Sequence, residues 1–129
     1  MVDPSLAQEV QSAYAVYWAR RLEATYTRDM APLEDVVAGQ ELTGSQQYLE
    51  QLRADGHALG GGVEHHPVLL SATGDEALIF DQYEDHSYYI DPATKVPLEP
   101  PLSGVTNSVT FRLQKISGIW KVTGGSVND

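Results

Sequence analysis

Residues 63–90 read VEHHPVLLSATGDEALIFDQYEDHSYYI. Apolar and polar residues alternate along this stretch with a period of two, and β-branched and aromatic residues are frequent, which is the pattern of half-buried strands. Thr73-Gly74-Asp75-Glu76 interrupts the alternation with residues typical of a tight turn. The stretch therefore predicts an antiparallel hairpin with strands at residues 63–72 and 77–90.

A second hairpin is predicted near the C-terminal end. Residues 105–116 and 119–127 flank Ser117-Gly118, which is another turn signal. Several large apolar residues share one face of this hairpin and need cover from another element. They are Val109, Phe111, Leu113, Trp120 and Val122.

The first half of the chain follows a helical period instead. Asp3 and Pro4 are typical of an N-cap and a first helical residue, and apolar residues then recur at three- and four-residue steps to about Thr27. Residues 32–37 predict a short helix closed by Gly39. A further helix, ending before Gly56, is marked on one face by Leu42, Ser45, Leu49 and Leu52.

Composition narrows the classes of protein that the chain can represent. With 129 residues, of which 42% are hydrophobic, it can form one domain, residues 1–129, with helices at about 4–56 and sheet at about 61–128. The formal net charge of −10 makes nucleic acid an improbable partner. No apolar run has the length of a membrane span and no signal peptide is evident, so we expect no membrane contact by this chain itself. A start at Met1 next to a helix cap equally fits a chain from which a leader was removed.

A two-residue loop at Gly74-Asp75 would place four polar residues on the inner face of the first hairpin. They are His66, Asp81, Tyr83 and Asp85, with His66 facing Tyr83. Polar groups buried in a sheet normally satisfy one another's hydrogen bonds, and we expect that structural role here. The alternative is catalysis, with His66 as a general base held by Asp81 or Asp85 beside the Tyr83 phenol.

The same register would place His65, Glu84 and His86 together on the outer face. Imidazole and carboxylate groups suit a divalent ion, but no zinc-binding pattern on a helix supports these three residues. We therefore predict no metal site and no cofactor. Cysteine is absent from the sequence, which excludes a disulfide scaffold.

Three aromatic residues, Tyr14, Tyr17 and Trp18, lie at helical spacing in the first predicted helix. Such a stripe most often packs in a core, although it also suits the wall of a ligand pocket. Together with the inner-face residues of the hairpin, they form the predicted ligand-binding set: Tyr14, Tyr17, Trp18, His66, Asp81, Tyr83 and Asp85.

Three segments together resemble the nuclear-transport-factor-2-like superfamily. They are AYAVYW at residues 13–18, APLEDVVAG at 31–39 and GIWKV at 118–122. Residues 75–77, entering a strand that ends in YYIDP at 88–92, are more similar to bacterial extracytoplasmic domains that resemble the intermembrane-space domain of a plastid division protein. The resemblance implies a cone-shaped α+β fold in which N-terminal helices pack on a curved antiparallel sheet.

The resemblance also implies a function. Its bacterial subgroup implies a non-catalytic accessory domain, outside the cytoplasm, that binds a protein partner or a small apolar ligand, and homodimers through the sheet are common in this fold. The superfamily also includes ketosteroid isomerases and polyketide cyclases. A cofactor-free isomerase, cyclase or hydrolase using His66, Asp81 and Tyr83 is therefore the alternative.

Overall fold

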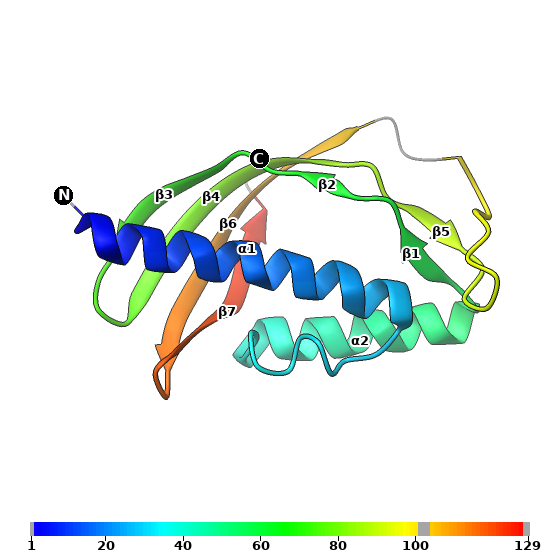
Figure 1. The fold of residues 1–129 in the computed structure, drawn as a ribbon, viewed down its shortest axis with the longest axis horizontal. Coiled ribbons are helices and arrows are strands. Elements are labelled where there is room, and N and C mark those ends of the chain that lie inside the picture. Colours follow the sequence, from blue (N-terminus) through cyan, green and yellow to red (C-terminus); the bar gives the residue numbers. More distant parts are fainter. Residues whose placement is uncertain (1, 101–103, 128–129) are drawn as a thin grey trace.

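Two helices pack on a curved, open antiparallel sheet (Figure 1). The computed structural model describes residues 2–100 and 104–127, so the expected end of the sheet at residue 128 lies outside the described part. The helices are α1 (Pro4–Thr27) and α2 (Gly39–Asp55). The strands are β1 (Ala58–Gly60), β2 (Val63–Glu64), β3 (Pro67–Ala72), β4 (Glu76–Asp85), β5 (Tyr88–Ile90), β6 (Val105–Ile116) and β7 (Ile119–Val127).

The strand order shows how the sheet is built. β4 pairs with β6, and β6 pairs with β7, while β3 and then β2 follow one another along the opposite edge of β4. β1 and β5 form a separate two-stranded ribbon beyond that point. In Figure 1, α1 runs across the sheet and continues beside this ribbon, so one long helix contacts two β-units.

The predicted first helix is confirmed at both ends. The Asp3 side chain accepts a hydrogen bond from the Ser5 backbone N–H at 2.7 Å, and Pro4 is the first helical residue. The helix ends at Thr27, where Arg28 adopts a left-handed conformation. The predicted helix that ends before Gly56 is also confirmed, because α2 ends at Asp55 and Gly56 caps it in a left-handed conformation.

The predicted short helix at residues 32–37 is wrong. Successive turns occupy this segment, in which the Leu33 N–H donates to the Met30 carbonyl and the Val36 N–H to the Leu33 carbonyl, each at 2.9 Å. The Val36 carbonyl accepts from the Val122 N–H of β7 at 2.9 Å. Because β7 occupies this backbone group, the segment joins the sheet edge as an isolated bridge and does not continue as a helix.

A β-bulge in the first hairpin overturns the expected register. Near the turn, Ala72 pairs with Ala77 and Ser71 with Leu78, as the two-residue loop requires, but Leu69 then pairs with Ile79. One extra residue in β3 reverses the face of every residue before it. The predicted inward placement of His66 is therefore wrong, and His65 takes the inner position.

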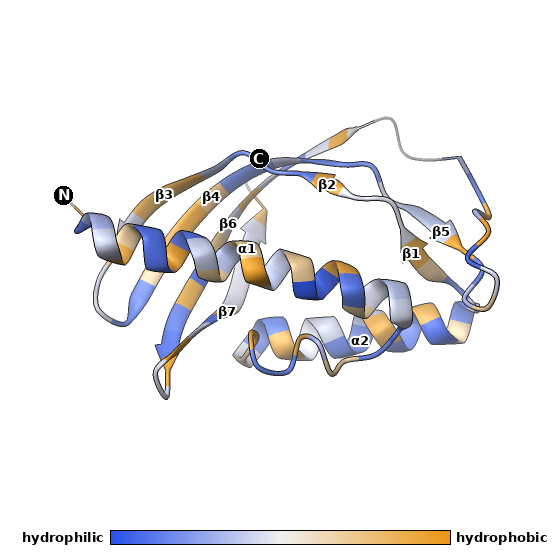
Figure 2. Cartoon of the chain, viewed as in Figure 1, coloured by the Kyte–Doolittle hydropathy of each residue, from blue (hydrophilic) through white to orange (hydrophobic). Residues whose placement is uncertain are grey.

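The main core lies between α1, α2 and the inner face of the sheet. The five apolar residues expected to share one face of the C-terminal hairpin are all buried, together with Ala77 and Ile79 of β4. Figure 2 shows hydrophobic and hydrophilic residues alternating along the strands, as half-covered strands require. On the outer face, Val68 and Leu70 are each 54% exposed.

Candidate functional site

Asp81 is the most deeply enclosed charged side chain in the described part of the chain. It lies on the inner face of β4 and is 0% exposed. Its Oδ2 accepts from the Tyr14 hydroxyl at 2.5 Å and lies 2.7 Å from His65 Nδ1, while its Oδ1 accepts from the His66 backbone N–H at 2.9 Å. Both carboxylate oxygens are therefore engaged by protein groups, and water does not reach them.

An aromatic cluster seals this carboxylate. The Tyr14 and Trp18 rings both contact the ring of Phe111, and Trp18 also packs against His65 with ring centroids 4.6 Å apart. The Trp18 indole N–H is buried and forms no hydrogen bond with a described residue. It lies near the Tyr14 hydroxyl and lowers the pKa of that phenol. Tyr14, Tyr17 and Trp18 are thus core residues first.

The hydroxyls of Tyr14 and Tyr17 should ionise only when the protein unfolds. Burial is the largest cause that raises both pKa values above the unfolded value of about 10, and the Asp81 carboxylate raises that of Tyr14 further. Because the folded-state pKa exceeds the unfolded one, this stabilisation is complete below about pH 10 and is lost as the pH rises further. Phenolate absorbance and circular dichroism, followed together in an alkaline titration, should show a shared late step.

The double variant Tyr14→Phe/Tyr17→Phe should lose the phenolate part of that step. All seven tyrosines ionising before the circular dichroism changes would contradict the sealed cluster.

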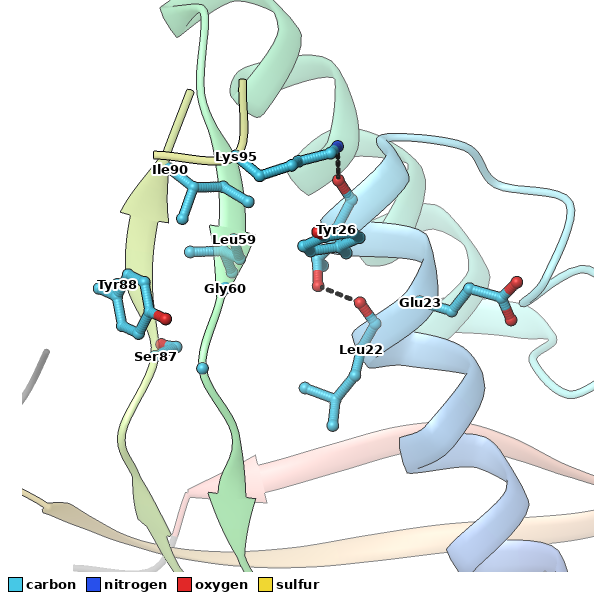
Figure 3. A pocket seen from close by; sticks show the side chains of 11 residues that line it. Leu22, Glu23, Tyr26, Leu59, Gly60, Ser87, Tyr88, Ile90 and Lys95 are labelled. Atoms are coloured by element: carbon cyan, nitrogen blue, oxygen red, sulfur yellow. Dashed lines mark hydrogen bonds between the residues drawn. The ribbon is translucent and has the colours of Figure 1, made fainter. Parts of the chain in front are cut away.

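A cleft opens beside the C-terminal half of α1. Its widest part is a hollow of about 400 Å³ between α1 and the β1/β5 ribbon. In Figure 3, Leu59 and Ile90 face Leu22 and Tyr26 across the gap, while Glu23 points away from it. Lys95 closes one end, where its Nζ donates to the Tyr26 carbonyl at 3.3 Å and lies 4.3 Å from the centre of the Tyr26 ring.

A smaller and more polar hollow, of about 80 Å³, adjoins the first. The two share Leu22, Thr25, Leu59 and Ser87. The remaining lining comes from α1, α2, β2 and the end of β4, and consists of Trp18, Arg21, Tyr48, Val63, Tyr83 and Asp85. We call the two hollows together the cleft, and the second its polar end.

Arg21 is the cation at the polar end. Its Nη1 donates to the Tyr17 hydroxyl at 2.9 Å and lies 3.7 Å from Glu41 Oε1, while the guanidinium carbon lies 4.8 Å from the centre of the Trp18 ring. Glu41 itself accepts a hydrogen bond from the Tyr17 hydroxyl. These contacts hold the guanidinium in place on one side and leave its other N–H groups without a described partner.

Two tyrosine hydroxyls at the polar end have no hydrogen-bond partner among the described residues. They belong to Tyr48 of α2 and Tyr83 of β4. Burial is the largest cause that raises the pKa of each phenol, so both stay protonated at neutral pH. The guanidinium of Arg21 lowers both pKa values and the carboxylate of Asp85 raises both, so each phenol lies within the field of both charges.

The predicted ligand-binding residues divide into three groups. Trp18, Tyr83 and Asp85 line the polar end of the cleft, whereas Tyr14, Tyr17 and Asp81 lie in the core. His66 points away from both, because the bulge puts its side chain on the outer face. Sequence reasoning missed Arg21, Tyr48 and Leu59. Arg21 had a usable signal, since it lies three and four residues after Trp18 and Tyr17 on the buried stripe of α1.

The predicted outer cluster also changes composition. The structure brings Glu84 and His86 together with Glu64, not with His65, and one ligand atom of each lies within 4.8 Å of the others. The bulge is again the reason, because it sets Glu64 opposite Glu84. These side chains are exposed or half-buried, and the absence of a metal site stays a prediction.

Comparison with known proteins identifies relatives by structure alone. No protein-family model matches the sequence, and no curated protein matches it. The intermembrane-space region of the chloroplast protein ARC6 has a TM-score of 0.66 at 18% identity, covering 98% of this chain and 97% of that one. A ketosteroid isomerase-like protein from Erwinia carotovora has a TM-score of 0.57 at 16% identity, covering 99% of each. An NTF2-like protein from Rhodospirillum rubrum has a TM-score of 0.54 at 21% identity, covering 89% and 98%.

Proposed function

We propose that this domain of nuclear-transport-factor-2-like fold is a binding module that holds a small, largely apolar ligand in the cleft and catalyses no reaction there. The likeness to solved structures shows the fold, whose members include both binding domains and enzymes, and fold alone does not select between them. The choice rests on the chemistry of the side chains.

The observation that carries the proposal is the composition of the cleft. Its wide part is lined mainly by apolar and aromatic side chains, together with the polar residues Glu23, Thr25, Ser87 and Lys95, and its polar end carries hydroxyls without protein partners among the described residues. An apolar hollow with a few convergent polar groups is the usual arrangement of a small-molecule site. The polar groups would orient a ligand, and the apolar hollow would supply the free energy of desolvation.

Catalysis of the isomerase type by the predicted residues His66, Asp81 and Tyr83 finds less support. It needs a carboxylate base that meets the substrate, but Asp81 is fully enclosed and both of its oxygens are occupied. The expected partner His66 contributes its backbone N–H, not its imidazole, to Asp81. Asp81 is therefore better suited to hold α1 against the sheet than to move a proton on a ligand.

The cellular placement that we propose is outside the cytoplasm. The support is the similarity to ARC6, whose matching part is an intermembrane-space region. No helix among the described residues is both long and apolar enough to cross a bilayer. Binding of a protein partner and self-association through the sheet stay predictions.

Filling the cleft should weaken binding of an aromatic probe. Ser87 lines both hollows, so the indole of Ser87→Trp would occupy them without removing an apolar core contact. We expect the affinity for anilinonaphthalene sulfonate, measured by its fluorescence, to fall at least about tenfold. Ser12→Trp, on the exposed side of α1, is the matched control and should bind as the unaltered protein does.

Circular dichroism of both variants should show the same cooperative unfolding. Equal probe binding by Ser87→Trp and Ser12→Trp would refute the cleft as the binding site.

A further inference from the structure

We propose that the polar end of the cleft recognises the head group of an α-amino acid, whose carboxylate meets Arg21 and whose ammonium meets Asp85. This inference rests on the binding function proposed above and adds the chemical class of the ligand. It arises from two opposite charges that line one hollow without pairing with each other.

Both charges have unused bonding capacity. Among the described residues, the Arg21 guanidinium forms its contacts through Nη1, which donates to the Tyr17 hydroxyl and lies next to Glu41. Asp85 accepts through Oδ1 from the Ser87 backbone N–H at 2.9 Å and forms no ion pair with a described residue. A guanidinium presents five N–H donors and a carboxylate has two oxygens, so each can bind a further group.

The two free phenols add to this complementarity. The hydroxyls of Tyr48 and Tyr83 can donate to a ligand carboxylate beside the guanidinium, or accept from a ligand ammonium beside Asp85. Hydrogen bonds to charged groups are stronger than those between neutral groups. A ligand that carries both charges therefore uses every unpartnered polar group at this end.

Ligands with a single charge fit less well. A ligand with only a carboxylate would bring an anion next to Asp85, and one with only an ammonium would bring a cation next to Arg21. Repulsion or an unpaired charge would weaken the binding of each. The zwitterion avoids both costs. Its side chain would then extend into the wide hollow, where Leu22, Leu59 and Ile90 provide apolar contact.

Four probes with eight carbon atoms each separate these cases: α-aminooctanoate, octanoate, octylamine and octanol. Isothermal titration calorimetry on the full chain should show the tightest binding for α-aminooctanoate. Asp85→Asn should weaken that binding by about fivefold and leave octanoate unchanged or tighter, because the partly exposed charge pair is lost while the amide oxygen still accepts from Ser87.

Two further variants complete the test. Tyr83→Phe should weaken both carboxylate probes with little change in stability, because the hydroxyl has no described protein partner, and Tyr89→Phe, outside the cleft, should change neither. Glu84→Gln removes a neighbouring charge on the other face of β4 and should leave all four affinities unchanged.

The outcomes distinguish the two proposals. Equal affinity for octanoate and α-aminooctanoate, or an Asp85→Asn variant with unchanged preference, would overturn the head-group assignment while the cleft remains the binding site. If Ser87→Trp binds every probe as well as the unaltered protein does, the binding function itself fails.

Discussion

An Asp81→Ala variant should lose about 3–5 kcal/mol of its free energy of unfolding. The substitution leaves three donors without their acceptor, namely the buried Tyr14 hydroxyl and the partly buried His65 ring and His66 backbone N–H. Buried donors without acceptors keep their full desolvation cost, and a small cavity adds to it. Because domains are commonly stable by about 5–15 kcal/mol, this single change should bring the protein close to unfolding at room temperature.

Urea denaturation followed by tryptophan fluorescence measures the effect. Glu84→Ala, three residues along β4 on the outer face, is the control and should change the unfolding free energy by less than about 0.5 kcal/mol. Replacing both ends of the strongest contact, in Asp81→Asn with Tyr14→Phe, should recover part of the loss. A cost below about 1 kcal/mol for Asp81→Ala would show that the carboxylate is hydrated and not enclosed.

The two neighbouring histidines should differ sharply in their effect on stability. His65→Ala removes both the 2.7 Å contact to Asp81 and the packing on Trp18, and we expect a loss of about 2–3 kcal/mol. His66→Ala keeps the backbone N–H that bonds Asp81 and removes only an exposed ring, so its effect should stay within about 0.5 kcal/mol.

This pair of variants also tests the β-bulge directly. Without the bulge, His66 would face inward and the order of the two effects would be reversed. Equal losses would mean that neither ring is fixed against Asp81. The measurement is again urea denaturation, near neutral pH and at one salt concentration, so that only the side chain differs.

Local signals in the sequence predicted most of the fold. The Asp3-Pro4 cap, the Gly56 cap and the Ser117-Gly118 turn depend on interactions within a few residues, and each is present in the structure. The two long helices and the turns of the two hairpins followed from periodicity and turn residues. The single strand expected at residues 77–90 is wrong, because it is divided into β4 and β5 and β5 pairs with β1. The turns at residues 32–37 were missed because their backbone partner, Val122, lies far along the chain.

The inner cluster was predicted with the wrong histidine for an identifiable reason. Leu69 and Leu70 are adjacent and equally apolar, so alternation alone does not decide which of them faces the core. The structure buries Leu69 partly and exposes Leu70. On β4, which has no bulge, the inward positions of Asp81 and Tyr83 were predicted correctly.

The cleft could not be predicted from periodicity. Its wall depends on pairing between β1 and β5, which brings Leu59 opposite Tyr89 although β2, β3 and β4 lie between them in the sequence, and no local pattern predicts this contact. Gly61, which follows β1 and lines the wide hollow, adopts a φ of +86°, and a Cβ there would lie 2.6 Å from the His86 carbonyl oxygen, so this position requires glycine.

The extra residue in β3 affects how this chain must be aligned with its distant structural relatives. At 18% identity, identical residues are too few to reveal a one-residue offset. Where a relative lacks the extra residue, an ungapped alignment through Leu70 would match outward residues with inward positions from Val63 to Leu69. A functional role should therefore be transferred across this segment only between residues whose Cα atoms superpose, and not between residues that share a column of a sequence alignment.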